Sequence, residues 1–81
     1  MKEMLHDIVE SIIGEGRQID IVERTSEGED DQSDLIVLEL TVAREDMGKV
    51  IGKRGRIAKS IRTMVKACAS RRHQKVTVEI V

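Results

Sequence analysis

The stretch VIGKRGRI, residues 50–57, places two glycines around two cations, with an isoleucine within two positions of each glycine. Because glycine has no Cβ, the chain between Gly52 and Gly55 can turn tightly and approach a ligand closely. The turn would lead into a helix whose free N–H groups and positive dipole end favour phosphate. Lys53 and Arg54 would lie solvated at its tip. The stretch therefore predicts a clamp for the backbone of a single-stranded nucleic acid.

The length and composition of the chain suit a single domain over residues 1–81, since 40% of its residues are hydrophobic and can form one modest core. No apolar run approaches the length of a membrane span, and no basic and apolar leader with a cleavage site opens the chain. The single cysteine, Cys68, cannot form an intramolecular disulfide. We therefore expect a cytoplasmic protein without membrane contact.

Charge is distributed unevenly along the chain, although the formal net charge is only −1. Residues 1–43 carry three cations and twelve acids, whereas residues 44–81 carry eleven cations and three acids. This asymmetry is typical of a polyanion site in the second half. Charge pairing between the two halves would produce the same pattern, and the counts alone do not separate the two explanations.

Aromatic residues are absent: the chain contains no Phe, Tyr or Trp. RRM, cold-shock and OB-fold domains stack bases on aromatic rings, so these three classes are excluded. Bases bound by this chain would have to rest on aliphatic side chains and backbone hydrogen bonds.

Hydrophobic periodicity predicts six elements. Apolar spacings of three and four are typical of helices, and alternation of apolar and polar residues is typical of strands. The expected order is a helix, two strands that form a hairpin, a short helix, a longer helix and a third strand, over residues 5–13, 18–24, 35–42, 43–51, 56–71 and 75–81. Helices collected on one face of a three-stranded sheet give a two-layer α+β domain.

The last two helices are expected to bury apolar stripes. These stripes are Met47, Val50 and Ile51 in the short helix, and Ile57, Ile61, Met64, Val65 and Cys68 in the longer one. Cys68 is then a small buried hydrophobe and not a nucleophile.

Several functional sites are excluded by spacing. The acidic segment 25–34, expected to be a solvated loop, lacks the ordered ligand spacing of a calcium loop. His6 has no histidine or cysteine at ligand spacing, and we interpret it as a surface residue. The P-loop pattern is missing, and the glycines follow a helix. No triad, metal set or acid–base pair is apparent, so we expect no enzyme, metal or cofactor.

The stretch at 50–57 is similar to the VIGxxGxxI motif of KH domains, with GXXG at residues 52–55. The order of the elements resembles the type II, bacterial KH arrangement. The resemblance covers essentially the whole chain and is to the small stand-alone bacterial KH proteins. Arg44 departs from the family pattern, in which we would expect a proline before the acidic pair.

This resemblance implies binding of single-stranded RNA in a groove for about four nucleotides, with the GXXG loop clamping the backbone. Carried over by position, the site consists of the loop residues Gly52, Lys53, Arg54 and Gly55, an aliphatic floor of Ile51, Ile57 and Ile61, and the flanking cations Lys49, Arg56 and Lys59. The acidic segment from Ser26 to Asp34 would be the variable loop on the opposite rim.

The resemblance also implies partners. Relatives of this type are RNA chaperones or post-transcriptional regulators that form homodimers, or heterodimers with a larger KH-containing protein of the Jag (KhpB) type. The alternative is a protein-interaction module, in which the stripe Ile57–Ile61–Met64 or the turn serves dimerisation and RNA contact depends on a partner. A phosphate clamp does not sense the 2′-hydroxyl, so RNA is preferred over DNA only through the resemblance.

Overall fold

The computed structural model describes residues 1–26 and 35–81, so most of the expected acidic loop lies outside the described residues. The chain runs through α1 (Lys2–Ile13), β1 (Ile19–Ser26), β2 (Leu35–Val42), the 3₁₀ turn η1 (Arg44–Asp46), α2 (Met47–Ile51), the 3₁₀ turn η2 (Lys53–Gly55), α3 (Arg56–Arg71) and β3 (Lys75–Ile80). This order confirms the predicted α+β class of the type II KH kind. When η1 is counted with α2, the expected boundaries are shifted by at most three residues. In the described part of the chain, no helix is both long and apolar enough to cross a membrane.

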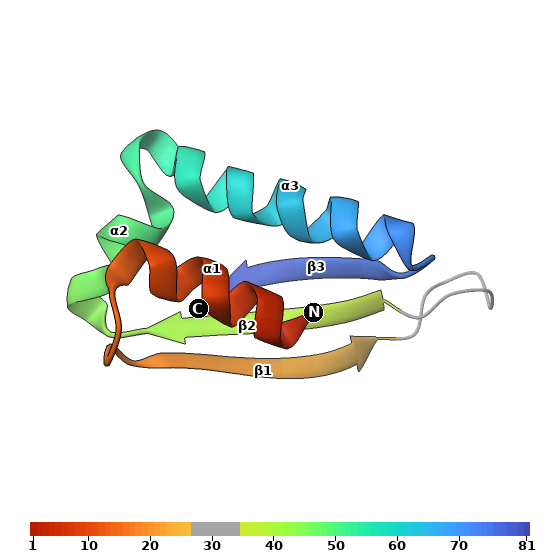
Figure 1. The fold of residues 1–81 in the computed structure, drawn as a ribbon, viewed down its shortest axis with the longest axis horizontal. Helices are drawn as coiled ribbons and strands as arrows, with labels where there is room; N and C mark the ends of the chain where they lie inside the picture. The colour runs from red at the N-terminus through yellow and green to blue at the C-terminus, as the bar shows by residue number, and fades with distance from the viewer. Residues whose placement is uncertain (27–34) are drawn as a thin grey trace.

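β2 is the central strand of a three-stranded sheet with the order β1-β2-β3. β1 pairs with it antiparallel, with Ile21 opposite Leu40, as expected of a hairpin. β3 pairs with it in parallel, with Val78 opposite Leu38, because α2 and α3 carry the chain back along the sheet before β3 begins. Figure 1 shows α1 and α3 side by side over one face of this sheet.

The core lies between this face and the helices. α1 buries Leu5, Val9 and Ile13 at helical spacing, as its periodicity predicts. The strands bury alternate residues against them, including Ile21, Leu38, Leu40, Val42, Val76 and Val78. Truncating one such large side chain to Ala typically costs about 2–5 kcal/mol, so this core fixes the positions of the helices.

The buried stripe of α3 differs from the expected one. It consists of Ala58, Ile61, Val65 and Ala69. Ile57 and Met64 are exposed and Cys68 is half-buried, so their assignment to the buried stripe was wrong. The two alanines allow α3 to approach the sheet closely, and this orientation turns Ile57 and Met64 away from it. Ile51 of α2, also expected to be buried, is exposed.

The opposite face of the sheet has no helix on it among the described residues, yet Val37 of β2 is only 4% exposed there. Val37 lies opposite Arg24 of β1 and Thr77 of β3. Arg24 forms ion pairs with Glu39 on β2 and, at 3.5 Å, with Glu79 on β3, so its side chain crosses the central strand. An arginine that lies across the strand in this way would account for the burial of Val37, because its aliphatic stem shields the valine while its charged end stays in contact with water.

The start of η1 shows why the departure at Arg44 leaves the fold intact. Ala43 has φ −57° and ψ 144°, the extended conformation that a residue before proline prefers. Arg44 is exposed at the first helical position, where proline is tolerated but not required.

Candidate nucleic-acid interface

The segment Gly52–Gly55 is a kink between α2 and α3 and not part of one continuous helix. Gly52 has φ 72° and ψ −177°, a region essentially restricted to glycine. Arg54 and Gly55 are both left-handed, with φ values of 57° and 74°. The expected tight turn between two helices is therefore present.

Ile57 adds a second reason for glycine at position 52. A Cβ placed on Gly52 would lie 2.5 Å from Cγ1 and 2.7 Å from Cδ1 of Ile57, so this side chain rests on the glycine. A Cβ on Gly55 would meet nothing within 4 Å. Gly52 is thus required by both conformation and space, whereas Gly55 is required by its positive φ alone.

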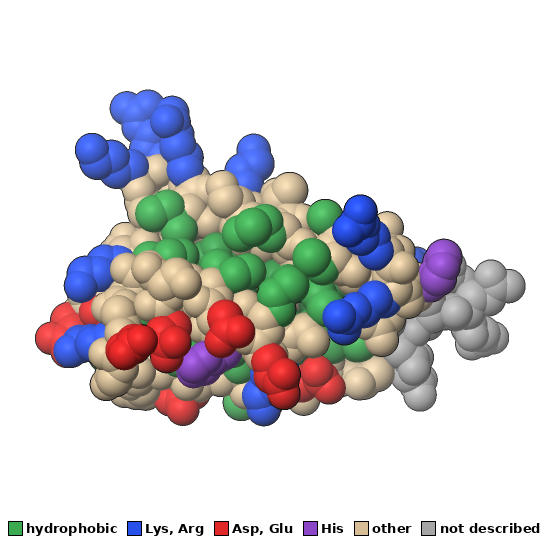
Figure 2. Space-filling model, in the orientation of Figure 1, with side chains coloured by type: hydrophobic (Ala, Val, Ile, Leu, Met, Phe, Trp, Pro, Cys, Tyr) green, Lys and Arg blue, Asp and Glu red, His purple; other side chains and the backbone are tan. Residues whose placement is uncertain are grey.

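The cations of the loop are exposed, and Figure 2 shows Lys and Arg side chains projecting from this end of the molecule. Lys53 and Arg54 lie at the tip, Arg56 begins α3, and Lys59 lies one turn further along it. None of these four forms an ion pair with an acid of residues 1–26 or 35–81. Lys49 differs, because its Nζ lies 3.7 Å from a carboxylate oxygen of Asp46.

Charge pairing between the two halves of the chain does not account for these free cations in the described residues. The ion pairs that join the halves run from Arg17 and Arg24 to acids of the second half. No acid of residues 1–26 or 35–43 is paired with a cation of residues 44–81. The positive charge around the loop is therefore available to an external anion.

The expected aliphatic floor is only partly at the surface. Ile51 and Ile57 are 39% and 37% exposed, so a ligand can reach both side chains. Ile61 is 1% exposed and belongs to the core, which leaves no surface for a base to contact.

An ion pair between the exposed Arg17 and the buried Asp46, which local sequence patterns do not predict, holds the start of α2. Asp46 is 1% exposed and accepts a hydrogen bond of 2.8 Å from Nε of Arg17, in the connection between α1 and β1. Arg17 also donates from Nη2 to Glu45 at 2.6 Å. The hydrogen bond to Asp46, followed by the one to Glu45, raises the pKa of Arg17 above its usual value, so the guanidinium stays charged. The pair ties α2, and with it the loop, to the end of α1.

We expect Asp46→Asn to lower the midpoint of thermal unfolding by about 5–10 °C, because the substitution keeps the shape of the side chain but removes the buried charge. Glu45→Gln is the matched control: it alters the same arginine's other partner, whose side chain is 73% exposed, and should change the midpoint by no more than about 2–4 °C. Equal midpoints for both variants, measured by circular dichroism, would contradict this role of Asp46.

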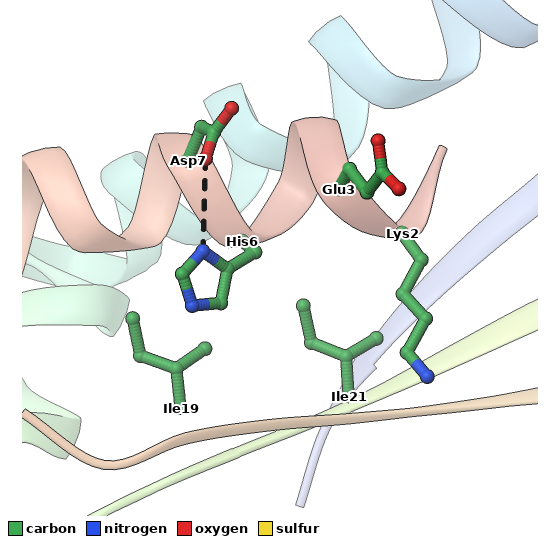
Figure 3. Close-up of a pocket in the computed structure, with 6 residues that line it drawn as sticks. All are labelled: Lys2, Glu3, His6, Asp7, Ile19 and Ile21. Carbon is green, nitrogen blue, oxygen red and sulfur yellow. Dashed lines mark ion pairs between the residues drawn. The ribbon is translucent and has the colours of Figure 1, made fainter.

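Away from the loop, a shallow hollow of about 560 Å³ lies between α1 and β1 (Figure 3). Its lining consists of Lys2, Glu3, His6, Asp7, Ile19 and Ile21. The apolar floor from β1 faces a rim that includes two acids, so this hollow is unsuited to a polyanion.

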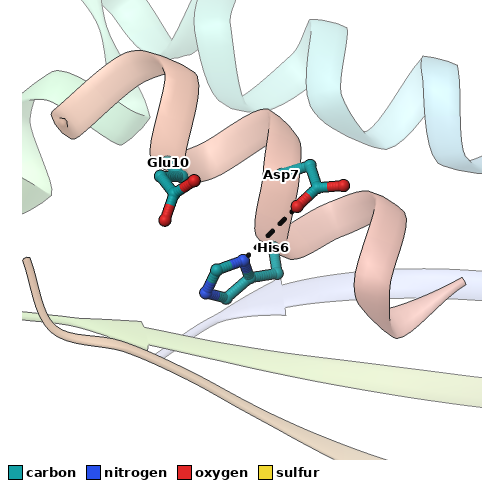
Figure 4. Close-up of side chains that lie close together, drawn as sticks. All are labelled: His6, Asp7 and Glu10. Atoms are coloured by element: carbon teal, nitrogen blue, oxygen red, sulfur yellow. Dashed lines mark ion pairs between the residues drawn. The ribbon is translucent and has the colours of Figure 1, made fainter. Parts of the chain in front are cut away.

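Three side chains of α1 come together beside this hollow (Figure 4). His6 pairs with Asp7 at 3.6 Å, and these two and Glu10 bring their ligand atoms within 4.8 Å of one another. The partners of His6 here are carboxylates of the same helix, and not the histidine or cysteine whose absence at ligand spacing led to its interpretation as a surface residue. All three side chains come from one solvated face of α1. Clusters of exposed acidic groups are common on protein surfaces without a bound metal ion, so this cluster alone does not indicate a metal site.

Comparison with known proteins places the chain in a family. Residues 2–80 match the family described as KhpA/KhpB, KH domain. Proteins named RNA-binding protein KhpA are 49% identical in Clostridium acetobutylicum and 47% identical in Clostridium perfringens, over all of both chains. The protein of that name in Chlamydia trachomatis is 40% identical over 99% of this chain and 95% of its own.

A crystal structure of Era from Aquifex aeolicus has a similar fold, with a TM-score of 0.68 over 98% of this chain and 28% of Era. Because the two sequences are only 17% identical, this likeness concerns the fold alone. The match over residues 2–80 and the full-length relatives establish the family itself, which is not a family of enzymes. This chain belongs to the KhpA/KhpB family of KH-domain proteins.

Proposed function

We propose that this protein binds single-stranded RNA by clamping its sugar-phosphate backbone on the loop Gly52–Gly55. The observation that carries the proposal is the kinked loop, whose tip cations Lys53 and Arg54 are exposed and unpaired with any acid of residues 1–26 and 35–81. Charged side chains of this kind form strong hydrogen bonds with phosphate oxygens. The name RNA-binding protein KhpA, carried by the relatives, supports RNA over DNA.

The bases would rest on exposed aliphatic side chains near the clamp. Ile51 and Ile57 flank the loop on both sides, and the chain has no aromatic ring on which a base could stack. Such a site holds RNA weakly, and weak binding suits an RNA chaperone or post-transcriptional regulator acting in the cytoplasm. Pairing with a second copy, or with a larger KH-containing protein of the KhpB type, would raise the avidity without new contacts.

Salt dependence tests the clamp. We expect the logarithm of the RNA-binding constant to fall with the logarithm of salt concentration with a slope of about −2 to −3, if three or four phosphates are engaged at about 0.7 each. The measurement is fluorescence anisotropy with a labelled oligonucleotide, repeated with DNA of the same sequence. A flat response to salt would contradict the clamp.

A second candidate function is protein association through the exposed part of α3. Ile57 and Met64 lie two helical turns apart on one side of this helix, and Met64 is 47% exposed. Figure 2 shows hydrophobic side chains gathered on the helical face of the molecule between α1 and α3. Size-exclusion chromatography with and without RNA separates the candidates, because a dimerisation module gives the larger species in both runs.

A further inference from the structure

Arg62 of α3 reaches the unpaired edge of the sheet. Its Nε donates a hydrogen bond of 3.2 Å to the carbonyl oxygen of Val78 in β3, and the contact is partly buried. β3 is an edge strand of the described sheet, with β2 on its other side. Since the carbonyl of Val78 accepts from a side chain of α3, it faces this free edge. The bond uses one of five guanidinium N–H groups, and Nη1 and Nη2 have no acid partner among residues 1–26 and 35–81, so they remain available as a pair.

Arg62 and the exposed apolar residues lie on different sides of α3. At 100° per residue, Arg62 is about 140° around the helix axis from Ile57 and about 160° from Met64. Lys59 and Lys66 lie three residues before and four residues after Arg62, so the three cations form one basic row. Arg62 is seven residues beyond Gly55, which places it about 10 Å along the helix from the loop.

The basic row leads to a second hollow. This hollow has a volume of about 370 Å³ and is lined by Leu35, Lys66, Ser70, Gln74, Lys75, Val76 and Thr77. Its two lysines form no ion pair within residues 1–26 and 35–81. A polyanion held at the loop therefore has a basic path along the edge of β3, past Arg62, whereas α1 on the other side of α3 carries Glu3, Asp7 and Glu10.

We propose that Arg62 is a specificity-determining residue that binds the O6 and N7 atoms of a guanine in the RNA. This inference rests on the proposed function, because it requires RNA at the loop. The two free Nη groups form a fork of donors, and O6 and N7 of guanine are two adjacent acceptors. Adenine presents a donor beside its N7, and uracil lacks an acceptor pair on that edge. The bond from Nε to Val78 holds the fork in place before RNA arrives.

The test compares a uridine hexamer with the same hexamer carrying one internal guanosine. Wild type is expected to bind the guanosine-containing RNA about 5- to 150-fold more tightly, the range for one bidentate contact with a base. Arg62→Lys keeps the charge and a donor for Val78 but has no fork, so both RNAs should bind it equally, with an unchanged salt slope. Arg71→Lys makes the same change at an exposed position of the same helix and should keep the preference.

The outcomes separate this inference from the proposed function. Equal binding of both RNAs by wild type, with its salt slope intact, would overturn the role of Arg62 and leave the clamp standing. A guanosine preference that survives in Arg62→Lys would overturn it as well, as would a loss of thermal stability without a change in the affinity ratio. Wild type that shows no salt-dependent binding to either RNA would overturn the clamp itself.

Discussion

Replacing Lys53 and Arg54 together by Asp is expected to lower the affinity for single-stranded RNA at least about 100-fold. Each charged hydrogen bond to a phosphate contributes about 1.5 kcal/mol, so losing two corresponds to about 3 kcal/mol, and the new carboxylates also repel the RNA. The salt slope should become shallower by about 1.4, at about 0.7 for each lost phosphate contact. The folded state should be retained, since both side chains are exposed and without an acid partner in residues 1–26 and 35–81.

A matched variant separates local contact from overall charge. Lys2→Asp with Arg44→Asp makes the same change in net charge at two exposed cations outside the loop. Both positions begin helical segments, where an acid complements the helix dipole, so stability should not suffer. Anisotropy titrations should show a much smaller loss of affinity for this control than for the loop variant. Similar losses in both would mean that general charge, and not the loop, holds the RNA.

The sequence predicted the order and type of the three helices and three strands because each follows from a short-range pattern. Alternation in residues 35–42 and helical spacing in α1 are local, and each agrees with the burial in the structure apart from Val37, which is buried on the opposite face of the sheet. The tight turn followed from two glycines three positions apart between two helical patterns, because glycine readily adopts the positive φ values that such a turn needs. The helices, the strands and the turn could therefore be predicted without knowledge of contacts between distant segments.

Contacts between distant segments could not be predicted in the same way. Arg17 and Asp46 are 29 residues apart, and nothing in the local pattern around either residue indicates that the carboxylate is buried. The sequence alone did not determine which side of α3 faces the sheet, because two apolar stripes share Ile61 and Val65. The stripe with Ala58 and Ala69 packs on the sheet because small side chains permit close approach, and this choice depends on the shape of the sheet surface that α3 contacts.

Gly52→Ala is expected to destabilise the fold by about 2–6 kcal/mol. The new alanine would have to adopt a backbone conformation that costs about 1–3 kcal/mol for any residue other than glycine. Displacing the side chain of Ile57 adds about 1–3 kcal/mol more. That sum is a large part of the total stability of a small domain. Chemical denaturation followed by circular dichroism measures it. A loss below about 1 kcal/mol would show that the loop relaxes freely.

Gly55→Ala is the counterpart, because the same methyl group enters open space. The left-handed backbone should cost only about 1–2 kcal/mol, so this variant stays folded. If the RNA backbone approaches the loop closely, the added Cβ at position 55 stands between them, and affinity should fall several-fold while the fold is kept. The two glycines then have separable roles: Gly52 shapes the loop by receiving Ile57, and Gly55 leaves the surface bare for the ligand. RNA affinity unchanged in Gly55→Ala would place the bound strand away from this residue.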